Sequence, residues 1–233
     1  MKIEKLVFVG HSAVFLKTSI GTIAIDPWLE GNPSCPDELK NPDDLKLIVL
    51  THGHADHASD TTRLAKHYGC EIIATWELAN LLISEGVPQD NVIHMNKGGS
   101  YNWNGATVSL VDAKHSSSYD TADGPQYAGE ACGVVISANK TIYHAGDTSL
   151  FEGMTYLGEN FKPDVALLPC GDRFTMGPKD AALAAKMIGA GVTVPIHWGT
   201  FDLLTGSADQ FSECCRENGV ESQVLQSGGA ISF

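Results

Sequence analysis

Short apolar runs punctuated by Gly, Pro, Asn and Asp give the first part of the chain a strand-like pattern. Residues 6–9, 13–17 and 23–25 are apolar or alternating, which predicts three strands of a meander. The first and third strands of a meander run in the same direction, so residues just past their ends share one edge of the sheet. His11 and Asp26 occupy these two positions.

Strands and helices alternate in the next part of the chain. Residues 45–50 form a continuous apolar run typical of a buried strand, and residues 59–68 have helical spacing with Gly69 as a stop. Residues 70–75 predict a second strand parallel to the first, completing a βαβ unit. A short helix is expected at Trp76–Glu85.

A hairpin signal marks the middle of the chain. Asn104-Gly105 separates strand-like residues 101–103 and 106–112, and the second strand leads to His115. Two stretches lack any packing pattern and are expected to be loops, residues 30–44 and 116–129. The second is longer than a connection requires, which makes it a candidate lid over a site.

The last hundred residues repeat the mixture of strands and helices. The strand at 141–145 leads to Asp147 and the strand at 192–196 leads to His197. A proline in the first turn and Gly189 after the end favour a helix over 178–188. The remaining expected elements are strands at 132–138, 164–168, 221–226 and 230–233, and a helix at 207–218. Periodicity alone therefore indicates a mixed α/β fold.

Composition narrows the class of protein. The 233 residues are 43% hydrophobic and 18% charged, which suits one globular domain over 1–233. The net charge of −13 opposes contact with nucleic acid or with an anionic membrane, so neither is expected as a partner. No secretory signal or membrane-span pattern is found, and the six cysteines are scattered, which predicts free thiols and a cytoplasmic location.

The most informative stretch follows the apolar run 45–50. Within six positions it supplies His52, His54, Asp56 and His57, and imidazoles with a carboxylate are ligands that divalent transition metals prefer. A single loop histidine usually has no function, but three with an aspartate at this spacing favour a metal site. His52 and His54 point the same way if the backbone is extended, whereas Asp56 and His57 turn with the beginning helix. One loop could therefore contribute to two metal sites.

On these residues the chain resembles the metallo-β-lactamase superfamily, and within it a branch of uncharacterised metal-dependent hydrolases related to ascorbate-6-phosphate lactonase. The resemblance covers the whole chain. It rests on His52-x-His54-x-Asp56-His57 and on Gly10-His11-Ser12, Ile25-Asp26-Pro27, His115-Ser116-Ser117-Ser118, Tyr143-His144-Ala145-Gly146-Asp147-Thr148, Phe174-Thr175-Met176-Gly177-Pro178 and Ile196-His197. It implies a four-layer αββα sandwich with two mixed sheets and helices outside.

The resemblance also implies a ligand set for two divalent metal ions. One ion would be held by His52, His54 and His115. The other would be held by Asp56, His57 and His197, with Asp147 bridging the two. Zinc is expected first, and manganese, iron and nickel accept the same ligands. A dinuclear centre of this kind makes a metal-bound hydroxide available at neutral pH, so Asp56 and Asp147 are the candidate catalytic carboxylates.

Five further residues are expected around the centre. By the resemblance, Asp26 lies behind the histidine loop and accepts an imidazole N–H, which fixes the tautomer of that ring. His11 and His144 are expected to be structural or to line the pocket. Thr175 lies on a loop that would form a pocket wall, and Arg173 on that loop either pairs with an anionic substrate or is only solvated.

The expected function is a metal-dependent hydrolase acting on an ester-like bond, a lactone or carboxylic ester, of a small molecule. Two alternatives stay open: a phosphodiesterase for small substrates, and a non-hydrolytic redox or sensor protein that binds metal. The identity of the substrate, the native metal and association into a homo-oligomer are not encoded in any motif of the sequence.

Overall fold

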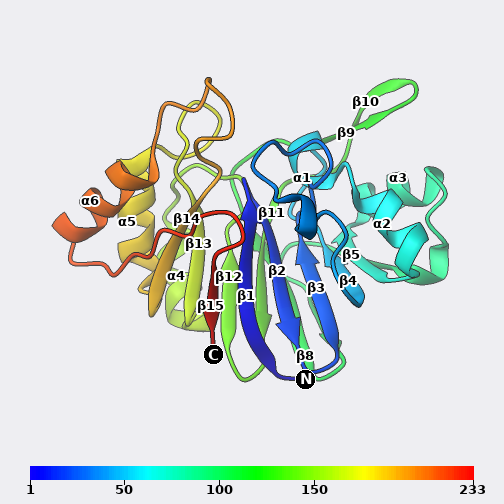
Figure 1. Cartoon of the computed structure of the whole chain (residues 1–233), viewed down its shortest axis with the longest axis horizontal. Helices are drawn as coiled ribbons and strands as arrows, with labels where there is room; N and C mark the ends of the chain where they lie inside the picture. Colours follow the sequence, from blue (N-terminus) through cyan, green and yellow to red (C-terminus); the bar gives the residue numbers. More distant parts are fainter.

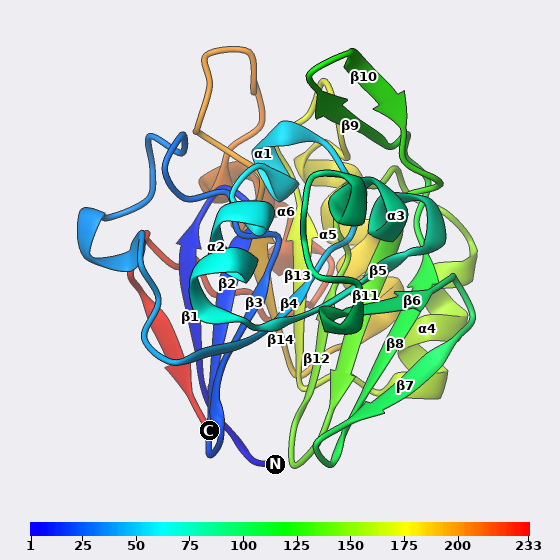
Figure 2. The same ribbon diagram turned by 90° about the vertical axis from the view of Figure 1, so that its right-hand side faces the viewer.

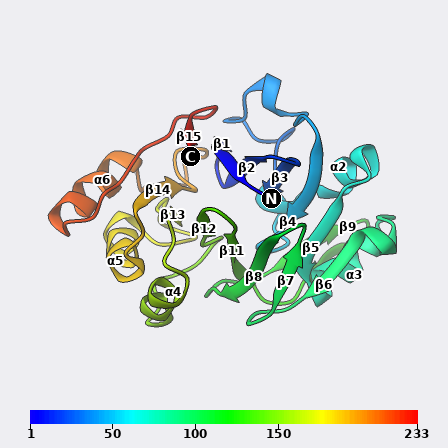
Figure 3. The ribbon, with the colours of Figure 1, turned by 90° about the horizontal axis from the view of Figure 1, so that it is seen from below.

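Two β-sheets lie face to face at the centre of the molecule, and helices cover the outer face of each (Figures 1 and 3). The computed structural model describes all 233 residues. The first sheet has seven strands in the order β15-β1-β2-β3-β4-β5-β6. Its strands are β1 (Ile3–Gly10), β2 (Ala13–Thr18), β3 (Gly21–Ile25), β4 (Leu45–Val49), β5 (Glu71–Thr75), β6 (Val92–Met95) and β15 (Ala230–Ser232).

The second sheet has six strands in the order β14-β13-β12-β11-β8-β7. Pairing is parallel from β12 to β14 and antiparallel from β12 to β7. Its strands are β7 (Ser100–Trp103), β8 (Ala106–Asp112), β11 (Cys132–Ser137), β12 (Thr141–His144), β13 (Val165–Pro169) and β14 (Val192–Ile196). The Asn104-Gly105 turn joins β7 to β8, and both of its residues have positive φ, as the sequence signal requires.

The helices divide between the two outer faces (Figure 3), and a separate hairpin projects from the upper end of the molecule (Figure 2). Helices α2 and α3 lie outside the first sheet, and α4, α5 and α6 lie outside the second. The bounds are α1 (Ala55–Ala58), α2 (Thr61–Tyr68), α3 (Trp76–Ser84), α4 (Gly153–Phe161), α5 (Pro178–Ile188) and α6 (Ala208–Glu217), with short 3₁₀ turns η1 (Asp37–Leu39) and η2 (Gln89–Asn91).

Three apolar cores correspond to the three contacts between the four layers. Along β4, Leu47 and Val49 face the core between the sheets, while Leu45 and Ile48 face the core under α2 and α3. Strand β12 divides in the same way, because Ile142 faces the first sheet and Tyr143 faces α4 and α5. Successive side chains of a strand point to opposite faces, so a strand buried on both sides reads as a continuous apolar run. The predicted four-layer αββα sandwich is confirmed.

Strand direction brings the ends of strands from both sheets to one edge of the sandwich. Strands β1, β3 and β4 run in one direction in the first sheet, and β8, β12 and β14 share a direction in the second. Their carboxyl ends meet at the edge opposite the two chain termini, which is the upper edge in Figure 1. The candidate ligands all follow these strands.

Four parts of the sequence prediction differ from the structure, and one of them is that strand β6 (Val92–Met95) was not predicted. Residues 116–129 are not an irregular loop, because β9 (Ser118–Thr121) and β10 (Gly124–Tyr127) pair into a hairpin that lacks any apolar alternation. Residues 221–226 are not a strand, since they make only a single bridge between Ser222 and Thr193. Helix α4 was not predicted, because its glycines and the polar Glu159-Asn160 obscure the helical spacing.

Two expectations about the chain as a whole have structural counterparts. All six cysteines are free thiols, as their spacing predicted. No helix has the length and apolar character that crossing a membrane demands.

Candidate metal centre

The histidine loop is extended at its start and helical at its end. It leaves β4 at Thr51, and His52, Gly53 and His54 precede the first turn of α1, which carries Asp56 and His57. The Gly53 N–H donates to Ser117 Oγ at 3.1 Å. A Cβ on Gly53 would lie 2.8 Å from the carbonyl oxygen of Ser118, so only glycine lets the loop pack this closely against β9.

Three histidines form a first cluster. His52 Nε2 and His54 Nδ1 are 3.0 Å apart. One ring nitrogen each of His52, His54 and His115 lies within 4.8 Å of the other two. His115 is held just past the end of β8, so this cluster joins the two sheets.

A second cluster lies beside the first and contains a carboxylate. Asp56, His57 and His197 bring one ligand atom each within 4.8 Å of one another, and His11 belongs to the same group. His197 Nε2 is 3.6 Å from Asp56 Oδ2, and His11 Nε2 is 3.0 Å from that same oxygen. His11 is expected from the sequence to be structural or to line the pocket, whereas the structure brings it into the cluster.

Asp147 contacts histidines of both clusters. Its Oδ1 is 3.3 Å from His57 Nε2, and its Oδ2 is 3.1 Å from His197 Nε2 and 3.7 Å from His115 Nε2. The carboxylate is 2% exposed, at the end of β12. Its two oxygens therefore face the space between the clusters, where a bridging ligand would lie.

Asp26 lies behind the histidine loop and is fully buried. It accepts hydrogen bonds from the Thr51 N–H at 2.8 Å and from the Thr51 hydroxyl at 2.6 Å. Its Oδ2 is 2.7 Å from His57 Nδ1, which turns the other ring nitrogen of His57 towards Asp147. This contact places Asp26 where it can fix the His57 tautomer.

The backbone is strained at three of these positions. His11, Asp26 and His197 have φ of 58°, 48° and 55°, in the left-handed region that residues other than glycine rarely adopt. Each directly follows a strand and turns its side chain towards the cluster. Strain of this kind persists where the surrounding structure fixes it and is frequent at functional sites.

The electrostatics of the second cluster and Asp147 favour bound positive charge. Burial opposes the charge of Asp147, but His197 and His57 outweigh it and hold the pKa of Asp147 well below its usual value. Burial likewise opposes a charge on His57, yet Asp147 and Asp26 raise its pKa well above the ordinary value. His197 follows the same pattern, with its pKa raised to about 9, mainly by Asp147 against burial. Positive charge at these nitrogens is thus stabilised by the surrounding carboxylates.

The first cluster is different, because burial dominates there. Burial lowers the pKa of His52 well below its ordinary value and also lowers the pKa of His54 and of His115. These rings are neutral at pH 7 and can donate a lone pair to a cation, which is the form in which histidine binds metal.

The donor set fits divalent metal ions. His57 Nε2, His197 Nε2 and Asp147 Oδ1 are among the buried side-chain atoms without a hydrogen-bond partner, and these three lie next to one another in the clusters. Imidazole nitrogens and carboxylate oxygens suit zinc, manganese, iron and nickel. Ions bound between the clusters would satisfy these atoms.

The outer residues from the sequence analysis have other contacts. His144 uses both ring nitrogens, since one lies 2.8 Å from the Ser12 carbonyl oxygen and the other accepts from the Gly146 N–H at 3.0 Å. Arg173 is exposed and stacks on its neighbour Phe174. Thr175 donates to the Met176 carbonyl at 3.4 Å. None of the three makes a hydrogen bond or ion pair with the clusters.

Some positioning residues were not identified from the sequence. Thr51 connects Asp26 to the histidine loop, and Thr200 Oγ1 is 2.9 Å from His11 Nδ1. A Cβ on Gly171 would collide with the carbonyl oxygen of His197, so this glycine permits the close approach of the two loops. No local pattern identifies these residues, because each acts across a long sequence separation.

One wall beside the second cluster is aromatic. The ring centroids of Trp28 and Phe201 lie 5.7 Å apart. The centroid of the His11 ring is 5.2 Å from that of Trp28 and 5.4 Å from that of Phe201. Phe201 is 36% exposed, while Trp28 is 8% exposed. The side chain of Asp56 is 29% exposed, so solvent reaches the second cluster at this carboxylate.

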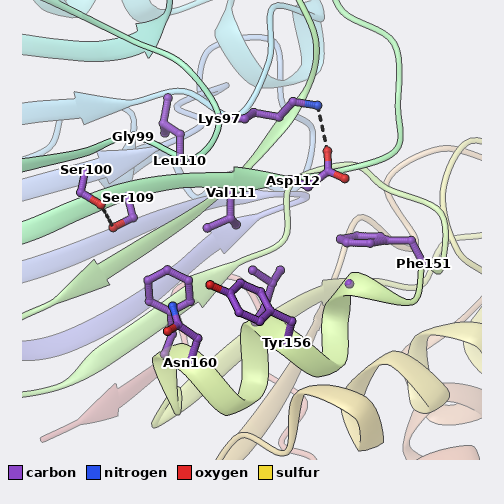
Figure 4. Close-up of a pocket in the computed structure, with 14 residues that line it drawn as sticks. Lys97, Gly99, Ser100, Ser109, Leu110, Val111, Asp112, Phe151, Tyr156 and Asn160 are labelled. Carbon is purple, nitrogen blue, oxygen red and sulfur yellow. Dashed lines mark hydrogen bonds and ion pairs between the residues drawn. The ribbon is translucent and has the colours of Figure 1, made fainter.

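A groove of about 530 Å³ lies elsewhere, where α4 crosses β8 on the outer face of the second sheet (Figure 4). Tyr156 and Asn160 of α4 face Ser109 and Val111 of β8 across it, and Lys97 pairs with Asp112 at 2.8 Å. None of the candidate ligands lines this groove.

Comparison with known proteins shows which family and which solved structures the chain is similar to. A family model described as a β-lactamase superfamily domain matches residues 22–198, which contain every candidate ligand except His11. The chain is 40% identical over 224 residues to a UPF0173 metal-dependent hydrolase of Rubrobacter xylanophilus, covering 94% of this chain and 92% of that protein. It is 46% identical over 232 residues to another from Anoxybacillus flavithermus, covering 98% and 100%.

A solved structure is similar over the full length. Igni18, described as a novel metallo hydrolase from the hyperthermophilic archaeon Ignicoccus hospitalis, superposes with a TM-score of 0.88 at 33% identity. The match covers 100% of this chain and 99% of that one.

Proposed function

Because the chain belongs to the metallo-β-lactamase superfamily and is a metal-dependent hydrolase, we propose that it cleaves a lactone or carboxylic ester of a small molecule. The observation that carries this proposal is the pair of adjacent clusters with Asp147 between them. His52, His54 and His115 would hold one divalent ion, and Asp56, His57 and His197 would hold the second, with Asp147 shared between them. Bound divalent ions supply hydroxide at neutral pH and polarise the scissile bond.

The surroundings of the centre favour an uncharged ester group over a phosphodiester. Arg173 makes no contact with the clusters, and Lys114, next to His115, pairs with Asp112 at 2.7 Å. The net charge of −13 would repel an anionic diester, and neither Arg173 nor Lys114 is free at the clusters to bind it. The Trp28 and Phe201 wall instead offers apolar surface for the organic part of an ester.

The two carboxylates of the centre, Asp147 and Asp56, have different proposed roles. Asp147 lies between the clusters, with Oδ1 3.3 Å from His57 Nε2 and Oδ2 3.1 Å from His197 Nε2, and would be the carboxylate that the two ions share. Asp56 Oδ2 faces His11 and His197, while its Oδ1 makes no hydrogen bond. If only one ion were bound, Asp56 would orient the attacking water or accept its proton, and that proton would pass to the departing alkoxide, which leaves as an alcohol. No serine or cysteine nucleophile is needed.

The metal is proposed to be zinc in the first cluster, whose three imidazoles match a common zinc ligand set. Manganese, iron and nickel accept the same donors, so reconstitution with each metal is part of the test. The substrate is a small molecule that reaches Asp56 past the aromatic wall.

Hydrolysis assays on three substrate classes test this function. Metal-stripped and reconstituted protein is given lactones, aryl carboxylic esters and bis-aryl phosphodiesters. We expect turnover of the first or second class, dependent on added metal and lost on chelation. Asp90→Asn, which changes an exposed carboxylate far from the clusters, is the matched control and should keep full activity. Turnover of the phosphodiesters alone would replace the proposed bond with a phosphodiester.

A further inference from the structure

Two buried histidines of the clusters, His57 and His52, share one arrangement of ring nitrogens, whereas the Nδ1 of His197 has no hydrogen-bond partner. In His57, Nδ1 contacts Asp26 at 2.7 Å and Nε2 faces Asp147. In His52, Nδ1 contacts the Thr51 hydroxyl at 3.0 Å and Nε2 faces His54. One nitrogen is thus held by a neighbouring oxygen, and the other points into the site. This is the usual geometry of a metal-binding histidine.

His11 has the same arrangement. Its Nδ1 is 2.9 Å from Thr200 Oγ1, and its Nε2 points to Asp56 Oδ2 at 3.0 Å, among the ligand atoms of the second cluster. The distance equals the 3.0 Å between His52 Nε2 and His54 Nδ1, two ligands proposed for one ion. His144 shows the contrast, because backbone groups of Ser12 and Gly146 occupy both of its nitrogens.

The His11 ring is also fixed in place. Its backbone is left-handed, and its carbonyl oxygen accepts from the His197 N–H at 2.8 Å. The ring is 1% exposed and lies between His197 and Trp28, with ring centroids 4.0 and 5.2 Å away. A residue that only lined the pocket would not require a strained backbone and an oriented ring.

We propose that His11 is a fourth side-chain ligand of the second metal ion, beside Asp56, His57 and His197. The inference rests on the proposed two-metal centre and extends it. With Asp147 shared, the second ion has five protein donors, three nitrogens and two oxygens. Five donors exceed the three that catalytic zinc commonly takes from protein, so the second site suits an ion that accepts five or six ligands, such as manganese, iron or nickel.

The test measures metal binding rather than catalysis. The chain is stripped of metal and titrated with cobalt(II), whose visible absorption is intense when tetrahedral and weak when five- or six-coordinate. In the wild type we expect two binding steps, the second giving weak absorption. In His11→Asn the second Kd should rise by more than about 100-fold, since losing only an outer partner of a ligand costs about 10- to 100-fold. The first step should not change.

Asparagine is chosen because it tolerates the left-handed backbone of position 11. His11→Gln is the second variant if the first folds poorly, and His94→Gln, which removes a histidine stacked on Trp76 outside the clusters, is the matched control. Thr200→Val, which removes only the Nδ1 partner, should weaken the second step less than His11→Asn does.

Three results would overturn the assignment of His11. The first is a single cobalt-binding step in the wild type. The second is a second step whose intense absorption indicates tetrahedral cobalt. The third is a His11→Asn variant whose second Kd and absorption spectrum are unchanged. In the last case a loss of hydrolysis would mean that His11 only orients Asp56 through a hydrogen bond. These readouts need no substrate. Failure to hydrolyse any ester would therefore remove the proposed substrate class while the cobalt titration still decides the role of His11.

Discussion

Asp147→Asn is expected to lower hydrolysis by more than about 100-fold, because loss of a mere outer partner of a metal ligand already costs about 10- to 100-fold. Asp147 is the carboxylate whose two oxygens face histidines of both clusters, at 3.1 to 3.7 Å. Asparagine keeps its shape but replaces one of these oxygens with an amide NH2 group, which cannot bind a cation. Both kcat/KM and the metal content per chain should fall.

Steady-state kinetics and elemental analysis of the same preparation measure the effect of Asp147→Asn. Circular dichroism should show a folded protein, because the substitution removes no apolar surface. Asp90→Asn again serves as the carboxylate control. Full activity in Asp147→Asn would show that the two clusters do not act through a shared carboxylate.

Asp26→Ala is expected to destabilise the metal-free protein by about 3–5 kcal/mol, the usual cost of breaking a buried ion pair by removing one partner. Asp26 is completely buried and receives two hydrogen bonds from Thr51 besides its contact with His57. Removing it leaves these groups buried without a partner. Urea unfolding of the metal-stripped chain, followed by circular dichroism, measures the loss.

Asp26→Asn distinguishes the contribution of Asp26 to stability from its contribution to metal binding. Asparagine accepts the left-handed backbone and can still accept from the Thr51 N–H, so the loss of stability should be smaller than in Asp26→Ala. It cannot orient His57 as a carboxylate does, and metal affinity should fall about 10- to 100-fold. Equal stability of both variants and the wild type would remove Asp26 from its supporting role.

Much of the fold could be predicted from the chain, because strands buried on both faces give continuous apolar runs. Residues 178–188 and 192–196 are a helix and a strand with the predicted bounds. The Asn104-Gly105 hairpin is confirmed as well. The hairpin at 118–127 could not be predicted in this way, because its strands are largely exposed and their sequences contain no run of apolar residues.

The candidate site was predictable where ligands follow strand ends in a dense motif. Spacing alone indicates that four residues of the histidine loop are ligands: His52, His54, Asp56 and His57. The ligand role of His115, Asp147 and His197 could be predicted only from the resemblance to a known family. His11 sits alone near the start of the chain, so nothing local separates a ligand from a pocket residue. Its neighbours Thr200 and Asp56 are 189 and 45 residues away in sequence.

The relatives' description as metal-dependent hydrolases favours hydrolysis over the redox or sensor alternative. The ligand set, the number of ions and the ester substrate stay predictions. Each depends on whether the clusters bind metal as described.

Elemental analysis of the reconstituted protein tests this central point most directly. We expect about two divalent ions per chain, as a dinuclear hydrolytic centre requires. His54→Ala, alone or with His115→Ala, should lower this content while the protein stays folded, because both side chains lie at the edge of the site and are partly exposed. A wild type that binds no metal, or variants with unchanged metal content, would contradict the account.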